Sequence, residues 1–191
     1  AIGASLEVLG QLEAARGKHK DAIEFFRMHL NLYKGTAIEK RLRKNWNLLA
    51  LTGKPAPAIN GEVPKSALIF LWAHYCGDCK AQAPAVLRIA ATLKNPGVRL
   101  IAPTQLYASI DGKDATPDAE RAFIEKTWKD TYGAPSLEAM VIDESAMLAY
   151  GASTTPTIVL TDAKGIVRWY HAGRITEHKL HEQVRTALTD R

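Results

Sequence analysis

Residues 72–80 read Trp72-Ala73-His74-Tyr75-Cys76-Gly77-Asp78-Cys79-Lys80 and contain both cysteines of the 191-residue sequence. The pair follows the apolar run 67–73, which predicts a buried strand, and it opens a helical pattern at 79–94. A bare C-x-x-C spacing serves zinc sites, haem attachment and redox chemistry alike. The position of this pair between a strand and a helix favours redox chemistry.

Haem and metal sites fit these residues less well. Haem attachment requires His directly after the second cysteine, and Lys80 takes that place. A tetrahedral zinc site requires two further ligands, and the chain has no second cysteine pair. The alternative is a mixed site in which His74 joins the cysteines with one of His171, His178 and His181. Our prediction is a site without metal or cofactor.

A helix start explains why such a pair is reactive. Cys76 would face the unpaired N–H groups and the positive end of the helix dipole, which favour the thiolate form of a cysteine. The thiolate is the attacking species in disulfide exchange. Cys79 follows one helical turn later, close enough to attack the mixed disulfide that results. The sequence therefore predicts Cys76 as the nucleophile and Cys79 as the resolving cysteine.

The quoted stretch resembles the active site of the thioredoxin family, whose pattern W-A-x-W-C-G-P-C-K-x-x-x-P ends here at Pro84. A second mark of that family is matched by Ser153-Thr154-Thr155-Pro156-Thr157, before an apolar strand, and Gly173 fits a third. An isolated X-Pro bond is cis in only about 5 to 6% of cases. The resemblance, however, implies a cis Thr155–Pro156 bond that faces the cysteines.

The resemblance also implies which residues meet a substrate. The backbone of Thr155 would be exposed beside Cys76, where an extended substrate strand pairs with it and aligns its disulfide. The other substrate-side candidates are Trp72, as a wall of the site, and Tyr75, Gly77, Asp78 and Pro156.

Two departures from the family pattern affect its proton chemistry. Thioredoxins carry a buried Asp six residues before the first cysteine, and this sequence has Phe70 there. Tyr75 and Asp78 replace the usual Trp and Pro. Asp78 should oppose the thiolate and lower the reduction potential, whereas a protonated His74 would act in the opposite direction. His74 and Lys80 are the candidates for acid–base work, and for each the alternative is a side chain that faces solvent.

Strands and helices alternate through the rest of the chain. Apolar runs predict further strands at 98–102, 139–142 and 157–160, and a hairpin turn at 163–165 precedes another at 166–171. Helical patterns occupy 117–132, 144–150 and 176–188. This order predicts an α/β/α sandwich around a mixed sheet that is parallel early and antiparallel at its end.

An insertion of a loop at 104–116, a helix at 117–132 and a strand at 139–142 is absent from a minimal thioredoxin. Together with the Gly53-Lys54-Pro55-Ala56-Pro57 opening and the Ala149-Tyr150-Gly151 approach to the proline, it resembles the TlpA/ResA-like branch. Members of that branch are exported thioredoxins, often tethered to membranes. The resemblance covers about residues 53–190 and implies an extracytoplasmic or periplasmic location, with any membrane tether outside this chain.

Residues 1–52 predict an all-helical segment in front of the thioredoxin-like domain 53–191. One apolar stripe runs through Leu6, Leu9 and Leu12, and others lie at 23–33 and 38–49. A capping box of Thr36 and Glu39 would open the third helix. The stretch Leu9-Gly10 with Ala14, Gly17, Ala22 and Phe26 resembles a single tetratricopeptide repeat (TPR), and the third helix is placed like the cap of such an array.

The formal net charge of +5 lies in residues 1–54, where ten Lys and Arg face five Asp and Glu. It is densest at Lys40, Arg41, Arg43 and Lys44, which predicts either a solvated helix face or a docking surface for a protein partner. Nucleic-acid binding is set aside because no binding motif accompanies the charge. No apolar run reaches the roughly 18 residues of a membrane span, and the sequence starts at Ala1 without a signal-peptide pattern.

The predicted function is thiol–disulfide exchange on protein substrates, as a reductant supplied by an upstream electron donor in an extracytoplasmic thiol pathway. One alternative is a peroxiredoxin-like peroxidase, although its reactive cysteine normally stands alone in a loop with Pro and Thr. The other alternative is an interaction module, in which the basic helical segment docks a partner and the thioredoxin fold is a scaffold.

Overall fold

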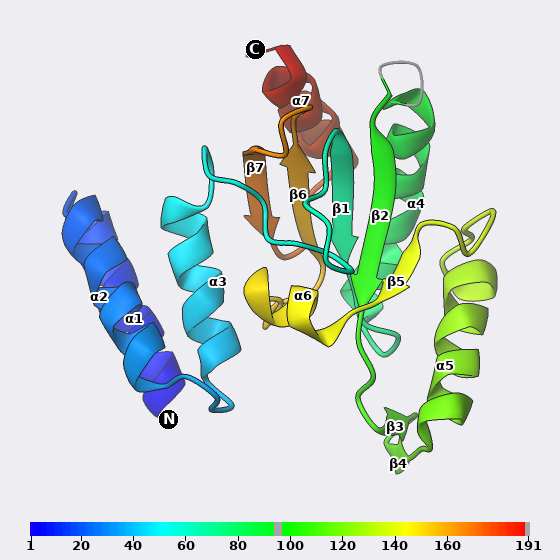
Figure 1. Ribbon diagram of the computed structural model, residues 1–191, viewed down its shortest axis with the longest axis horizontal. Helices are drawn as coiled ribbons and strands as arrows, with labels where there is room; N and C mark the ends of the chain where they lie inside the picture. The colour runs from blue at the N-terminus through cyan, green and yellow to red at the C-terminus, as the bar shows by residue number, and fades with distance from the viewer. Residues whose placement is uncertain (94–96, 190–191) are drawn as a thin grey trace.

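The computed structural model describes residues 1–93 and 97–189. Its centre is a five-stranded sheet of order β5-β2-β1-β6-β7, with helices on both faces (Figure 1). β1 pairs in parallel with β2 and antiparallel with β6, which pairs antiparallel with β7. The predicted sandwich around a mixed sheet is therefore confirmed. The strands are β1 (Ala67–Leu71), β2 (Arg99–Thr104), β5 (Met140–Ile142), β6 (Thr157–Thr161) and β7 (Val167–Ala172).

The strand β1 shows why helices cover both faces of the sheet. All five of its residues are completely buried. Leu68 and Phe70 belong to a core cluster with helices α4 (Gly77–Leu93) and α7 (Glu177–Thr189). The alternate residues, such as Ile69, belong to a second cluster with α6 (Glu144–Ala149). An apolar strand without polar alternation thus lies between two helical layers, because successive side chains point to opposite faces. The predicted helix at 79–94 matches α4, and residue 94 lies outside the described residues.

The predicted insertion between β2 and β6 lies at the β5 edge of the sheet (Figure 1). It comprises the hairpin β3 (Ser109–Ile110) and β4 (Lys113–Asp114), the helix α5 (Pro117–Lys126), a π-helical turn η1 (Thr127–Thr131) and the edge strand β5. Thr116 caps α5 by accepting a hydrogen bond from the backbone of Ala119, and Pro117 occupies the first helical position. The π-helical turn contains Trp128, which is buried in the same cluster as Phe70.

Three helices precede the sheet: α1 (Ile2–Ala15), α2 (His19–Leu32) and α3 (Glu39–Ala50). The spacing of Leu6, Leu9 and Leu12 correctly predicts the helix α1, but the interpretation of this stripe as its buried face is wrong, because Leu9 and Leu12 are 51% and 42% exposed. α1 instead buries Gly3 and Gly10. The ring of Phe26 on α2 occupies the space above Gly10, where a Cβ atom would lie 2.2 Å from the ring. The two helices therefore pack through a glycine contact that hydropathy does not report.

The predicted capping box at the start of α3 is also wrong. The hydroxyl of Thr36 donates to the carbonyl of Tyr33 at 2.7 Å, and α3 begins at Glu39 without a side-chain cap. Glu39 accepts a hydrogen bond from the backbone of Gly35 at 2.6 Å. Both side chains thus stabilise the turn between α2 and α3, since local acceptors compete successfully for them.

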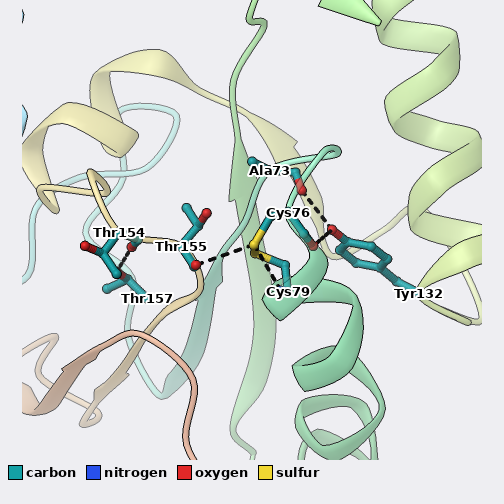
Figure 2. Close-up of a disulfide and its surroundings, with 7 residues drawn as sticks. All are labelled: Ala73, Cys76, Cys79, Tyr132, Thr154, Thr155 and Thr157. Atoms are coloured by element: carbon teal, nitrogen blue, oxygen red, sulfur yellow. Dashed lines mark hydrogen bonds between the residues drawn. A yellow bond between two sulfur atoms is a disulfide. The ribbon is translucent and has the colours of Figure 1, made fainter. Parts of the chain in front are cut away.

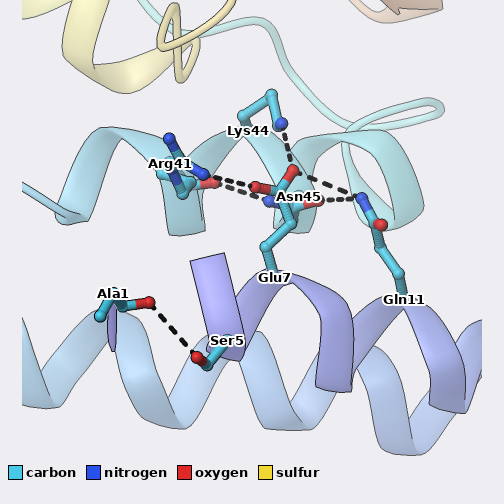
Figure 3. Close-up of polar contacts among 7 residues, drawn as sticks. All are labelled: Ala1, Ser5, Glu7, Gln11, Arg41, Lys44 and Asn45. Atoms are coloured by element: carbon cyan, nitrogen blue, oxygen red, sulfur yellow. Dashed lines mark hydrogen bonds and ion pairs between the residues drawn. The ribbon is translucent and has the colours of Figure 1, made fainter. Parts of the chain in front are cut away.

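The basic residues of α3 contact partners within the molecule. Arg41 and Lys44 both pair with Glu7 of α1 (Figure 3). Burial raises the pKa of Glu7, but Lys44, Asn45 and Arg41 outweigh this and lower it overall. Arg43 lies 3.7 Å from Glu39, and Lys40 donates to the side chain of Gln105 at 2.6 Å. Lys40, Arg41 and Lys44 therefore hold α3 to its neighbours, whereas Arg43 pairs within the helix.

α3 also packs on the domain that follows it. The side chain of Asn47 donates to the carbonyl of Ala149, at the end of α6, at 3.2 Å. Gly151 lies against the backbone of α3, where a Cβ atom would be 2.3 Å from the Lys44 nitrogen. Across the ranges 1–93 and 97–189, none of the helices combines the length and apolar character needed to cross a membrane.

Candidate functional site

The two cysteines form a disulfide at the N-terminus of α4 (Figure 2). Cys76 directly precedes the helix, and its carbonyl accepts the first helical hydrogen bond from Lys80 at 3.1 Å. The backbone N–H of Cys79 donates to the Cys76 sulfur at 3.0 Å. Cys76 is partly exposed, whereas Cys79 is completely buried. The helix start therefore stabilises negative charge on the sulfur of the less buried cysteine of the pair.

The segment before β6 lies against this sulfur. The Thr155–Pro156 peptide bond is cis, as the resemblance implies. The carbonyl oxygen of Thr155 lies 3.4 Å from Cys76 Sγ (Figure 2). Pro156 is buried, and its carbonyl accepts a hydrogen bond from the backbone of Gly173 at 2.7 Å. Gly173 thus fixes this segment from the end of β7.

Tyr132 holds the active-site turn from the side of the insertion. Its hydroxyl donates to the carbonyl of Ala73 at 2.8 Å and to that of Cys76 at 3.3 Å (Figure 2). The backbone N–H of Cys76 donates to the same Ala73 carbonyl at 3.0 Å. Burial raises the pKa of Tyr132 above its usual range, so the phenol remains a donor. Both ends of the turn 73–76 are therefore anchored to one side chain.

The prediction that Trp72 walls the substrate side is corrected by its burial. The side chain is completely buried, and its indole N–H donates to the carbonyl of Ala102 at 3.1 Å. Its ring stacks on Trp128 with centroids 5.2 Å apart and contacts Tyr132 at 4.9 Å. Because the Trp72 ring is inaccessible to a substrate, its role is to support the active-site turn from within the core. Phe70, in the place of the usual Asp, is likewise completely buried.

His74 does not face solvent, so that alternative is wrong for this residue. Its side chain is 2% exposed, and Nε2 lies 3.0 Å from Oε1 of Glu120, which is fully buried. The same carboxylate accepts hydrogen bonds from the backbone of Tyr107 at 2.6 Å and of Ala108 at 2.9 Å. The pair therefore links the active-site turn to the insertion.

The remaining candidates lie on the surface around Cys76. Gly77, Asp78 and Lys80 are exposed in the first turn of α4. Tyr75 is 67% exposed, and its ring contacts Tyr107 edge-on with centroids 4.8 Å apart. The structure thus brings Tyr75, Gly77, Asp78 and Thr155 to one accessible rim.

Among the described ranges, no three His, Cys, Asp or Glu side chains gather closely enough to hold a metal ion. His74 bonds to Glu120, and the two cysteines bond to each other. His171 stacks on Trp169 at 5.6 Å in β7. The mixed metal site is thus not assembled from these residues.

Three residues of the site were not predicted from the sequence: Tyr107, Glu120 and Tyr132. Glu120 lies in the first turn of α5, where an acidic residue is ordinary because of the helix dipole. Tyr132 lies at the end of a predicted helix and reads as a core residue. The roles of Glu120 and Tyr132 depend on contacts with the active-site turn, 46 and 59 residues away in sequence, and local patterns carry no signal of such contacts.

No protein-family model matches the chain. It is 31% identical over 153 residues to the thiol:disulfide interchange protein DsbE of Xylella fastidiosa strain 9a5c, which covers 69% of this chain and 68% of that protein. The DsbE of Haemophilus influenzae is 26% identical over 144 residues, covering 67% of this chain and 70% of that protein.

Solved structures share the fold. A Chlorobium tepidum protein described as of the DsbE kind superposes with a TM-score of 0.54 and 21% identity, covering 72% of this chain and 97% of that one. A thiol-disulfide isomerase from Corynebacterium glutamicum gives a TM-score of 0.52 at 20% identity, over 71% of this chain and 89% of that one. The sheet and its helical layers are thus those of the thioredoxin fold.

Proposed function

Because the chain belongs to the DsbE family of thiol:disulfide interchange proteins, we propose that it reduces disulfides in protein substrates outside the cytoplasm. The family and the Cys76–Cys79 pair establish a thiol-disulfide oxidoreductase. The direction, the substrate class and the compartment are the proposal. The observation that carries the mechanism is the asymmetry of the pair, with an accessible Cys76 at the helix start and a buried Cys79 behind it.

The reaction starts from the reduced pair. The Cys76 thiolate attacks one sulfur of a substrate disulfide, a bond forms between them, and the other substrate sulfur leaves as a thiolate that takes up a proton. Cys79 then loses its proton and attacks the Cys76 sulfur. This forms the Cys76–Cys79 disulfide and releases the second substrate thiol, so two electrons pass to the substrate. An upstream dithiol donor reverses the change.

The rim around Cys76 supplies the substrate contacts in this proposal. An extended substrate segment pairs with the backbone at Thr155, whose carbonyl lies 3.4 Å from the Cys76 sulfur. Tyr75, Gly77 and Asp78 flank the same sulfur and are exposed. Lys80 is exposed nearby and is the acid–base candidate that solvent reaches.

The two alternative functions receive less support from the structure. A peroxidase of the peroxiredoxin kind uses an isolated cysteine, whereas Cys76 is bonded to Cys79. An interaction module would use a free basic face, whereas Arg41 and Lys44 pair with Glu7. A protein partner at the helical segment, its TPR-like character and a membrane tether outside this chain stay predictions.

The reduction potential of the pair tests the proposal. We expect the Cys76–Cys79 pair to cycle reversibly in glutathione and dithiothreitol buffers, measured by thiol labelling, with a reduction potential of about −270 mV or lower. A value near about −120 mV would identify an oxidant instead. Failure to cycle would overturn the assignment. As a matched pair, Cys79→Ser should accumulate a mixed disulfide with substrate, whereas Cys76→Ser should not.

A further inference from the structure

Glu120 is an unusual member of the first turn of α5, because its side chain is completely buried. A buried carboxylate is costly unless hydrogen bonds replace its hydration. Glu120 receives three such contacts, and they use both of its oxygens. Oε1 contacts His74 Nε2 at 3.0 Å and the Tyr107 nitrogen at 2.6 Å, and Oε2 accepts from the Ala108 nitrogen at 2.9 Å.

These donors come from two separate segments that flank the redox site. Tyr107 and Ala108 lie in the loop after β2, whereas His74 lies in the active-site turn. Glu120 therefore joins the turn to the insertion through His74. In sequence, His74 lies between Ala73 and Cys76, the two residues whose carbonyls accept hydrogen bonds from Tyr132.

Ring contacts extend this connection to the surface. The imidazole of His74 meets the rings of Tyr75, Tyr107 and Phe123 edge-on, each with centroids 5.4 Å apart. Tyr75 also contacts Tyr107. The exposed ring beside Cys76 is thus supported by two residues that Glu120 holds in place.

The imidazole is badly placed for proton transfer to the cysteines. Its Nε2 is engaged by Glu120, and its Nδ1 is buried without a hydrogen-bond partner among the described residues. Neither ring nitrogen has a hydrogen bond to either sulfur in that part of the chain. A bridging role for the His74 side chain fits these contacts better than an acid–base role.

We propose that Glu120 is a positioning residue for disulfide exchange. It acts through His74, whose N–H bridge fixes the segment that carries Tyr75 and Cys76. The Cys76 sulfur is thereby held between the Cys79 N–H and the Thr155 carbonyl, at 3.0 Å and 3.4 Å. This inference rests on the proposed function, because it concerns the rate at which Cys76 attacks.

Two substitutions of His74 separate the bridge from other roles. His74→Gln keeps an N–H donor at about the position of Nε2 but cannot act as an acid or base. His74→Phe keeps an aromatic ring but has no donor. We expect His74→Phe to slow the attack of the reduced protein on oxidised glutathione about tenfold, because small displacements of a reacting group reduce rates steeply. His74→Gln should restore the rate to within about threefold of the unsubstituted protein.

Glu120→Gln provides an independent test, with Glu125→Gln on the same helix as a control for the lost charge. We expect the first to slow attack about tenfold and the second to leave it unchanged. The amide of Glu120→Gln keeps one acceptor oxygen but presents an NH2 donor to at least one of the three N–H groups that contact the carboxylate. Because this weakens the same bridge, adding His74→Phe should cost less than it does in the native sequence. Circular dichroism and thermal unfolding of each variant, and the potential of the pair, accompany the rates.

The outcomes are distinguishable. Equal rates for His74→Gln and His74→Phe, whether both slow or both unchanged, would overturn the proposal. Additive losses in the double variant would do the same, as would a slow rate that follows thermal stability alone across the set. If the unsubstituted protein does not cycle, the proposed function itself fails, independently of Glu120.

Discussion

The hydroxyl of Tyr132 donates to two carbonyls of the active-site turn, those of Ala73 and Cys76. Tyr132→Phe removes both hydrogen bonds and leaves each carbonyl with its backbone partner alone, the N–H of Cys76 for Ala73 and the N–H of Lys80 for Cys76. We expect the free energy of unfolding to fall by about 1 to 3 kcal/mol, and disulfide exchange at Cys76 to slow because the turn is less well fixed. Urea denaturation of the oxidised protein and exchange kinetics measure the two effects separately.

Tyr150→Phe is the matched control for this prediction. Tyr150 is buried on the other face of the sheet, and its hydroxyl donates to a backbone carbonyl, that of Pro57, at 2.8 Å. Its loss should cost comparable stability without a change in exchange rate. An equally large loss of rate in Tyr150→Phe would show that the kinetic effect is a general consequence of destabilisation.

Local chemistry determined which single residues could be predicted from the sequence. Cys76 and Cys79 lie in one short motif, and the cis bond before Pro156 is implied by another. The burial of Trp72 and the bond between His74 and Glu120 depend on the fold around them. Glu120 is 46 residues from His74, and no local rule distinguishes it from an acidic residue that faces solvent.

At the scale of helices, the contact between α1 and α2 depends on Gly10. Gly10→Ala would place a Cβ atom 2.2 Å from the Phe26 ring. The overpacking should lower the free energy of unfolding by about 1 to 3 kcal/mol, which exceeds the gain of up to about 1 kcal/mol in helix propensity. Chemical denaturation measures the change, and Ser5→Ala on the exposed part of α1 is the control.

A double-mutant comparison tests whether the Phe26 ring causes the loss of stability in Gly10→Ala. In a Phe26→Leu background, Gly10→Ala should cost less than in the native sequence, because the smaller side chain leaves room for the methyl group. Equal costs in the two backgrounds would mean that the ring contact is not the reason.

Periodicity predicted that α1, α2 and α3 exist, yet it did not identify the buried face of α1. Leu9 and Leu12 form an apolar stripe in the sequence, but the packed face is the one with Gly3 and Gly10. Hydropathy scores the side chains that are present, so it does not show that a glycine allows two helices to pack closely. The start of α3 differs from the prediction because the Thr36 hydroxyl donates to the Tyr33 carbonyl in the preceding turn and does not cap the helix.

At the scale of the whole molecule, Gly151 joins α3 to the segment that leads to Thr155. Its φ is +66°, and a Cβ atom there would lie 2.3 Å from the backbone nitrogen of Lys44. Gly112 has a similar φ of +77° but open space around it. Gly151→Ala should therefore lose at least about 2 kcal/mol more stability than Gly112→Ala, because backbone cannot move aside as a side chain can.

Limited proteolysis provides a second measurement of this contact. If Gly151→Ala separates α3 from the domain, trypsin should cleave within 40–54 faster than in Gly112→Ala. Equal cleavage and equal stability in the two variants would show that the close approach at Gly151 does not hold the helical segment in place.

The succession of strands and helices along the chain was predictable because each apolar run and its turn are local, and this alternation indicated a mixed sheet. The placement of charge was not. The count of basic residues in the first 54 positions is correct, but Arg41 and Lys44 meet Glu7, and Lys40 meets Gln105. Whether a cation is available to a partner depends on tertiary contacts that composition does not contain.

The turn that carries Cys76 is held by residues that come much later in the chain, namely Glu120, Tyr132 and Thr155. Polypeptides are made from the N-terminus, so a nascent chain presents both cysteines well before these residues exist. During that interval the two thiols have the reactivity of thiols in an unstructured peptide. Their specialised chemistry therefore arises as a late event of maturation, when the chain as far as Pro156 has been completed and has folded around them.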